Sequence, residues 1–473
     1  MSFLLSLRRQ TIPFLDAFVW YAYLFLLVVI SFLNDYYSSQ AWLLLSAFIY
    51  VLCGLCVCSA INGGLCNWRG LNQAKYVIII LCAMLLLLWL QITLPRSQYS
   101  DLLLLDNPLF NGEVPMWFEP PGRWSIVPNK TRWLLNSEAL VFSILVLSIA
   151  LLSSHRRLKQ LLYVVLFVGL FHSMVGIFTK YVGIILVEVE QLDGSYSAAR
   201  GWFINRNHYA AFVSLCLLGA LAFQLKDLIS HKQKFTRVMI IDQINRYKVI
   251  SLVAFIIGMI ALVLSQSRAG FISFLVSFFF VSIVVGRGKL INALRFSRRK
   301  LLIKLTVIVV VIIGFFGAEL MLRFSADSLL GERSAQWALS LASIKQAWIL
   351  GYGGNSYADV FQVVRGYQDF RQVLYNQSHN DYLHILLEQG LLGLTLWLGL
   401  LMLVFRAAYT AITNTTSSLV ISTLVSVMVV LFAALLQSGV DFNLQILNIR
   451  CYFFVIMSLA FSVPCIGPRK GSP

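Results

Sequence analysis

Long runs of hydrophobic residues, each about 20 residues in length, alternate with short polar segments along almost the whole chain. Such a run crosses the hydrocarbon core of a bilayer as one α-helix, because a backbone in lipid must satisfy its polar groups internally. The pattern therefore predicts an all-α integral membrane protein with about twelve transmembrane helices, of which the two around Gln266–Ala269 are the least clearly divided. The predicted spans are 14–33, 41–61, 75–94, 134–152, 161–186, 207–225, 249–264, 270–285, 301–322, 381–405, 419–437 and 447–463.

The polar segments divide the chain into four parts. Residues 1–133 hold the first transmembrane helices and an external loop rich in Pro and Trp, and residues 134–322 hold the central helices. Residues 323–380 form a large external loop, and residues 381–473 hold the last helices. Within the large loop, apolar residues recur at helical spacing over 337–348, which predicts a short amphipathic helix at the membrane interface.

Composition and charge agree with a membrane protein. Hydrophobic residues make up 59% of the chain and charged residues only 12%, whereas soluble domains carry about 25%. With both ends in the cytoplasm, most lysines and arginines face inward, as basic loops do. The net charge of +17 then reflects topology and contact with membrane lipids, chiefly through the basic run 287–304. No nucleic-acid partner is indicated, because the basic residues are spread over short loops.

Two arginines stand where a charge is costly. Arg206 lies in Asn205-Arg206-Asn207-His208, where a helix enters the membrane from outside, and Arg268 lies in a very short external turn between two spans. Such arginines need an anionic partner, although snorkelling to lipid headgroups is the ordinary alternative. Two of them on one membrane face are interpreted as a clamp for a pyrophosphate, because guanidinium forks match phosphate oxygens.

No metal site and no cofactor are predicted. The chain has no Asp-x-Asp sequence, and Glu188-x-Glu190 is typical of a solvated acidic loop. The thiols of Cys53, Cys56 and Cys58 have metal-like spacing but lie inside a span without a nearby histidine, so we assign them to packing.

His379 is the candidate general base. It stands at the external start of the span that follows the large loop, and a neutral imidazole suits deprotonation of a sugar hydroxyl. His384 follows five residues later, about 140° around the helix, so the two histidines are not expected to chelate one metal.

The sequence around His379 resembles the signature of the bacterial O-antigen ligase and polymerase superfamily. The match is His379-Asn380, nine residues, Gly390, two residues and Gly393. Further matches are Arg206, Arg268 and the run formed by Arg333, Trp337 and Gly351-Tyr352-Gly353, so that the resemblance covers residues 200–393.

This resemblance implies a metal-independent, inverting glycosyltransferase at the periplasmic face of the bacterial inner membrane. Its donor would be an undecaprenyl-diphosphate-linked glycan and its acceptor a hydroxyl of a glycan or of the lipid A core. In this interpretation His379 deprotonates the acceptor, and Arg206 and Arg268 neutralise the departing lipid diphosphate. Substrate binding would also involve Asn205, Asn380 and Arg333, whereas His384 is assigned to packing or support.

Other functions are compatible with parts of the pattern. A ligase, a repeat-unit polymerase and a protein O-oligosaccharyltransferase would share the signature, and the short tail 464–473 mildly disfavours the last. A polytopic transporter would suit twelve spans, but carriers place ionisable groups and broken helices near the midplane. Here the polar residues gather on the external face, and the midplane candidates Lys180, Gln266, Glu388 and Gln437 form no obvious relay. A membrane scaffold is the third hypothesis.

Overall fold

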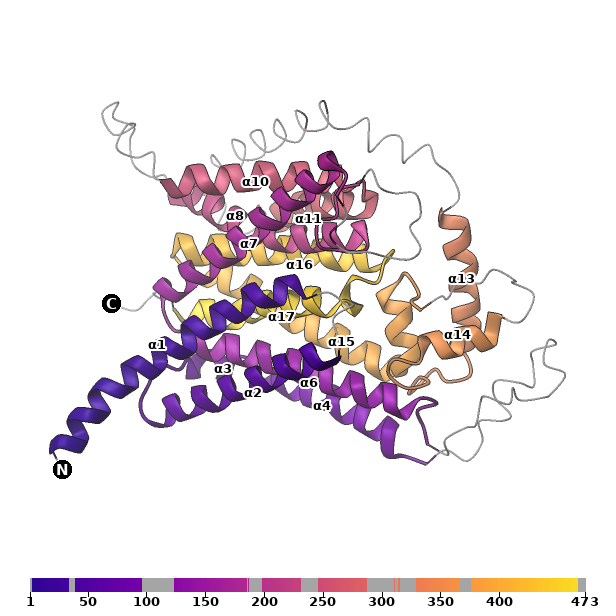
Figure 1. Cartoon of the computed structure of the whole chain (residues 1–473), viewed down its shortest axis with the longest axis horizontal. Helices are drawn as coiled ribbons and strands as arrows, with labels where there is room; N and C mark the ends of the chain where they lie inside the picture. Colours follow the sequence, from indigo (N-terminus) through magenta and orange to yellow (C-terminus); the bar gives the residue numbers. More distant parts are fainter. Residues whose placement is uncertain are drawn as a thin grey trace.

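The computed structural model of the chain is a bundle of helices (Figure 1). It describes residues 2–33, 39–95, 123–184, 186, 198–230, 246–286, 310, 314, 329–365 and 376–466. Within these residues the only extended pairing is an isolated bridge between Pro95 and Arg123. The helices are α1 Ser2–Phe32, α2 Ser39–Ile61, α3 Trp68–Gln73, α4 Lys75–Thr93, α6 Pro128–Leu151, α7 His155–Val182, α8 Arg206–Ser230, α10 Arg246–Leu264, α11 Arg268–Gly286, α13 Leu329–Ile344, α14 Tyr357–Arg365, α15 Asp381–Asn414, α16 Ser418–Ser438, η1 Asn443–Gln445, α17 Leu447–Ser462 and η2 Val463–Cys465.

Ten of the described helices are long and apolar enough to cross a membrane, which confirms the predicted fold class. They are α1, α2, α4, α6, α7, α8, α11, α15, α16 and α17. The apolar part of α10, Lys248–Leu264, is shorter, and α10 and α11 are separate helices, as the sequence suggested. The predicted span 301–322 lies outside the described residues except at positions 310 and 314.

Helices α8, α16 and α17 form the centre of the bundle. In the membrane-crossing windows of α8 and α17, 94% of the residues are buried, against 28% in α2. Helix α16 buries several hydroxyl side chains, and these bond to carbonyls of their own helix: Ser422 and Thr423 to Leu419 O, and Ser426 to Ser422 O. Small residues satisfied in this way allow helices to approach closely in lipid, where no hydrophobic force drives them together.

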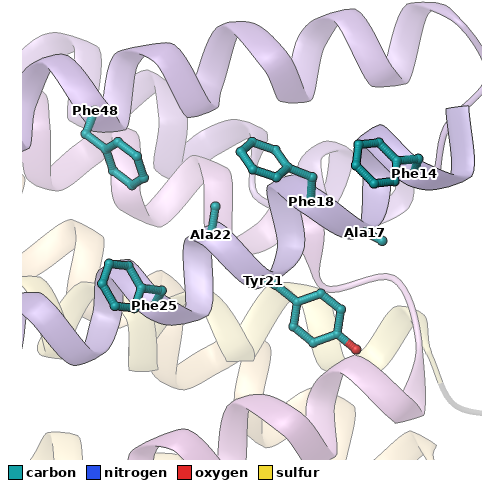
Figure 2. Close-up of a pocket in the computed structure, with 7 residues that line it drawn as sticks. All are labelled: Phe14, Ala17, Phe18, Tyr21, Ala22, Phe25 and Phe48. Atoms are coloured by element: carbon teal, nitrogen blue, oxygen red, sulfur yellow. The ribbon is translucent and has the colours of Figure 1, made fainter. Parts of the chain in front are cut away.

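Helices α1 and α2 lie at the edge of the bundle and carry part of its lipid-compatible surface. Figure 2 shows an apolar pocket whose lining includes Phe14, Phe18, Phe25 and Phe48. Phe14 is 76% exposed and Phe25 is 65% exposed, as expected for side chains that face acyl chains. This pocket has no charged lining residue, so the polar chemistry of the protein lies elsewhere.

The helices α13 and α14, which belong to the large loop between α11 and α15, lie beyond the right-hand ends of the long helices in Figure 1, whereas α1 begins at the opposite end. The loop is attached to the bundle by α4 and α6. Gln91 near the end of α4 donates to Leu350 O and Glu388 O, and Thr131 on α6 donates to Gly354 O. The loop is therefore packed on the ends of the spans.

Two buried ion pairs join membrane-crossing helices. Arg450 Nη1 on α17 lies 2.5 Å from Glu138 Oε1 on α6, and Arg157 Nη2 on α7 lies 2.5 Å from Asp16 Oδ2 on α1. The Arg157 guanidinium also lies over the ring of Trp20, 5.1 Å from its centroid. Each charge has its partner on another helix, so hydropathy alone does not reveal either pair.

Removing one partner of the Arg450–Glu138 pair should be more harmful than removing both. Both side chains are at most 5% exposed, so Glu138→Ala leaves a buried arginine charge, which costs roughly 3–5 kcal/mol of unfolding free energy. The double variant Glu138→Leu/Arg450→Met should lose much less. Denaturant unfolding in mixed micelles measures the free energy of unfolding of the wild type, the single variant and the double variant. Equal losses in the single and double variants would contradict the coupling.

Candidate functional site

The site is built around the turn of residues 439–446, which joins α16 to α17. Asn380, the N-cap of α15, accepts hydrogen bonds from the backbone N–H groups of Tyr382 and Leu383. Its Nδ2 donates to Gly439 O at 3.0 Å. The next residue, Asp381, accepts from Leu444 N at 3.1 Å and from Gln445 Nε2 at 3.2 Å. The two residues after His379 therefore fix the start of α15 to this turn.

His379 lies against the turn in an uncommon backbone conformation. Its φ is +49°, in the left-handed region that side chains other than glycine rarely adopt. Its Nδ1 lies 3.4 Å from Asp441 Oδ1, and its ring packs edge-on against Phe442 with centroids 4.9 Å apart. The imidazole is 31% exposed and the carboxylate 1% exposed, so the histidine side chain is partly accessible whereas its carboxylate partner is enclosed.

Asp441 is a buried carboxylate that lies near His379, His208 and Arg333. Burial alone would raise its pKa, but the hydrogen bond from His379 and the attraction of His208, His379 and Arg333 lower the pKa to about 2. Asp441 Oδ1 also accepts from Phe442 N at 2.9 Å. Asp441 is therefore ionised at neutral pH and can hold the imidazole in one orientation.

His208, on α8, also contacts the turn. Its ring packs edge-on against Phe442 with centroids 4.6 Å apart, so both imidazoles contact the same phenyl ring. The side chain is 7% exposed. Three segments distant in sequence thus meet at residues 441–442.

The two predicted arginines are the first residues of two helices whose N-terminal ends lie near this turn. Arg206 is the first residue of α8 and Arg268 the first of α11. Gln437, at the end of α16, donates to Asn207 O at 3.0 Å, and a Cβ added at Gly270 would lie 3.5 Å from Gln437 Oε1. The residues beside both arginines therefore converge on Gln437, four positions before Asp441. Helix N-termini favour anions, so two of them with two guanidinium groups suit a polyanion.

The remaining predicted residues also lie at this corner, with structural contacts of their own. Asn205 Oδ1 accepts from Asn207 N at 2.8 Å, which caps the start of α8. Arg333 Nη1, from α13, donates to Val440 O at 2.5 Å. Arg333 has five N–H donors, so this bond leaves others for further partners.

Steric constraints explain why the two signature positions, 390 and 393, are glycine. Gly390 has φ +65° and ψ −168°, which breaks α15 within its length. At this break Leu391 N donates to Trp348 O and Leu392 N to Ile349 O, and a Cβ at Gly390 would lie 2.3 Å from Ile349 O. A Cβ at Gly393 would lie 2.3 Å from Gln389 Cβ. The nine-residue spacing is thus the length of helix between Asn380 and the point where residues 348–349 of the large loop pack against α15.

His384 supports this packing. Its Nε2 lies 3.0 Å from Glu388 Oε1, and its ring stacks on Tyr357 of α14 at 5.0 Å. Glu388 Oε1 also accepts from Tyr357 N. Glu388 and Gln437, two of the polar residues weighed for a transport path, are therefore engaged in local hydrogen bonding.

Sequence reasoning did not single out Asp441 or His208. The rule that singled out Arg268, a charged residue in a short turn between two apolar spans, applies equally to Asp441. His208 follows Arg206 by two residues in the sequence, but Phe442, which its ring contacts, is more than 200 residues away. No local signal in the sequence therefore pairs the two residues. Within the described residues, no three His, Cys, Asp or Glu side chains gather where they could hold a metal ion.

Comparison with known proteins matches part of the chain to a family model. Residues 253–398 match the family model described as O-antigen ligase (Wzy_C). No curated protein matches the chain. The matched region contains Arg268, Arg333, His379 and the two signature glycines, whereas Arg206, His208 and Asp441 lie outside it.

Substituting Gly390 should destabilise the packing of the loop, whereas a second glycine of the same helix should tolerate change. Gly390→Ala forces a side chain into the left-handed region and against Ile349 O, a loss of roughly 2–4 kcal/mol. Gly399→Ala is the control, because its Cβ would meet only Ile80 Cδ1, at 3.6 Å. Thermal unfolding in detergent compares the two variants, and equal stability would contradict the steric argument.

Proposed function

The chain belongs to the O-antigen ligase family of glycosyltransferases, and from this premise we propose that it transfers a glycan from an undecaprenyl-diphosphate donor to an acceptor hydroxyl. The transfer would be inverting and metal-independent, and would occur at the periplasmic face of the bacterial inner membrane. The observation that carries the proposal is the contact between His379 and the ionised Asp441 beside two helices that begin with arginine.

His379 is the general base in this proposal. With Nδ1–H directed at Asp441 Oδ1, the imidazole keeps the Nε2 lone pair for the acceptor hydroxyl. Nε2 takes the proton as the acceptor oxygen forms a bond to the anomeric carbon. The bond between that carbon and the phosphate oxygen breaks, and the electron pair leaves with the lipid diphosphate. Asp441 stabilises the imidazolium that forms.

Arg206 and Arg268 are the groups that stabilise the leaving diphosphate. They stand at the N-termini of α8 and α11, so the helix dipoles add to the guanidinium charges. This arrangement takes the place that a divalent cation has in other diphosphate-dependent transferases. Asn205, Asn380 and Arg333 lie around the same corner and would complete the binding surface.

The family match favours an enzyme over a carrier or a scaffold. Within the enzyme class, ligase, polymerase and protein O-oligosaccharyltransferase differ only in the acceptor. We propose the ligase first, with the lipid A core as acceptor, and the product of the reaction distinguishes the three.

Substitutions in the site should abolish transfer without loss of protein. His379→Ala removes the base and should lower the rate by about 10²–10⁴-fold. Arg206→Ala and Arg268→Ala remove charge opposite the leaving group, and the matching lysine variants should recover part of the activity, since lysine keeps the charge but not the fork. EDTA should leave the rate unchanged.

The assay uses purified protein in liposomes with a lipid-diphosphate-linked glycan. Three acceptors are compared: lipid A core, a second lipid-linked glycan and a serine- or threonine-containing peptide. Lys130→Ala is the matched control, because Lys130 is an exposed external cation paired with Asp359 and should matter little. Full activity of the His379 or the arginine variants would contradict the proposed chemistry.

A further inference from the structure

One face of α13 contacts both chain segments that carry the His379–Asp441 pair. Arg333, Gln336 and Trp337 are spaced i, i+3 and i+4, so they share this face. Each donates a hydrogen bond to a backbone carbonyl of another segment. Trp337 Nε1 donates to Ser378 O at 2.9 Å, Gln336 Nε2 to Gln377 O at 2.7 Å, and Arg333 Nη1 to Val440 O at 2.5 Å.

Two of the three accepting carbonyls directly precede the members of the pair. Ser378 comes immediately before His379, and Val440 comes immediately before Asp441. The distance from His379 Nδ1 to Asp441 Oδ1 is 3.4 Å, near the outer limit of a hydrogen bond. A small displacement of either segment would therefore break the contact.

The strained backbone conformation of His379 also requires stabilising contacts from neighbouring segments. A non-glycine residue with φ near +49° persists only where its surroundings determine it. Ser378 Oγ bonds to Asn380 O at 2.6 Å, which closes the chain around His379. The bonds from Gln336 and Trp337 fix the preceding peptides on the other side.

We propose that α13 is a clamp that positions the His379–Asp441 pair. Trp337 and Gln336 hold the segment before His379, and Arg333 holds the segment before Asp441. The three are positioning residues, because they act through the pair. The inference rests on the proposed function, since it assigns to α13 the control of that same base.

The clamp is itself fixed to α15 through α14. Tyr357 Oη accepts from Gln336 Nε2 at 3.0 Å and lies 3.2 Å from Ser340 Oγ. Burial raises the pKa of Tyr357 to about 12, so its hydroxyl keeps its proton at neutral pH. The Tyr357 ring stacks on His384, whose partner Glu388 holds Tyr357 N. His384, five residues after His379, thus supports the clamp through Tyr357.

The test compares two identical substitutions at two tryptophans of the loop. Trp337→Phe removes the indole N–H that holds Ser378 O but keeps an aromatic ring. Trp348→Phe is the matched control, because Trp348 is 54% exposed. Two measurements are made on the purified full chain in liposomes: hydrogen exchange of the peptide over 376–383, and kcat and KM for donor and acceptor. Both variants are also made with Asp441→Asn.

If the clamp exists, Trp337→Phe speeds exchange over 376–383 several-fold and lowers kcat on the order of 10- to 100-fold with little change in either KM. In the Asp441→Asn background it lowers kcat no further, because the pair is already broken. Trp348→Phe behaves as the wild type in both measurements.

Unchanged exchange in Trp337→Phe overturns the clamp whatever the activity, because exchange is read without substrate. The clamp is also overturned if Trp337→Phe changes mainly KM, or if it lowers kcat by the same factor in the Asp441→Asn background as in the wild type. Either result indicates a general structural role for Trp337. A wild-type protein that transfers no glycan to any acceptor counts against the proposed function alone.

Discussion

One end of the helix bundle depends on the compensation of one buried carboxylate charge. Asp441 is 1% exposed at the junction of two membrane-crossing helices, where an uncompensated charge would cost several kcal/mol. Its compensation comes from the hydrogen bond with His379 and from the positive charge of Arg333, which belong to two other segments. The charge of Asp441 is therefore compensated only when α13 and the start of α15 are assembled around the 439–446 turn. The contact that stabilises this assembly also orients the imidazole.

The proposed chemistry divides between two sides of this corner. On one side a carboxylate and an imidazole form a base, and on the other two arginines begin α8 and α11. Gln437 and Asn207 join these sides by a hydrogen bond between α16 and α8. An acceptor hydroxyl and a lipid diphosphate can then meet at one place, which is what a displacement at the anomeric carbon requires. The ion pairs Arg450–Glu138 and Arg157–Asp16 are separate from this division and tie helices to one another.

The sequence predicted those features whose signal is local. Spans follow from runs of apolar residues, and the prominence of Arg206, Arg268 and His379 follows from polar residues at the ends of such runs. It did not predict what depends on contacts between distant segments. The position of Asp441 between two spans is visible in the sequence, but its contact with His379, 62 positions away, is not. The bridging contact of Phe442 with His208 and His379, and the kink of α15 at Gly390, likewise require the folded chain.

The most direct test of the central claim is a double-mutant cycle on His379 and Asp441, read as single-turnover glycan transfer at saturating donor and acceptor. If Asp441 acts by orienting His379, Asp441→Asn lowers the rate strongly in the wild type and has almost no further effect in the His379→Ala background. If the two losses instead multiply, Asp441 acts independently of His379. The base would then have to be assigned without the carboxylate.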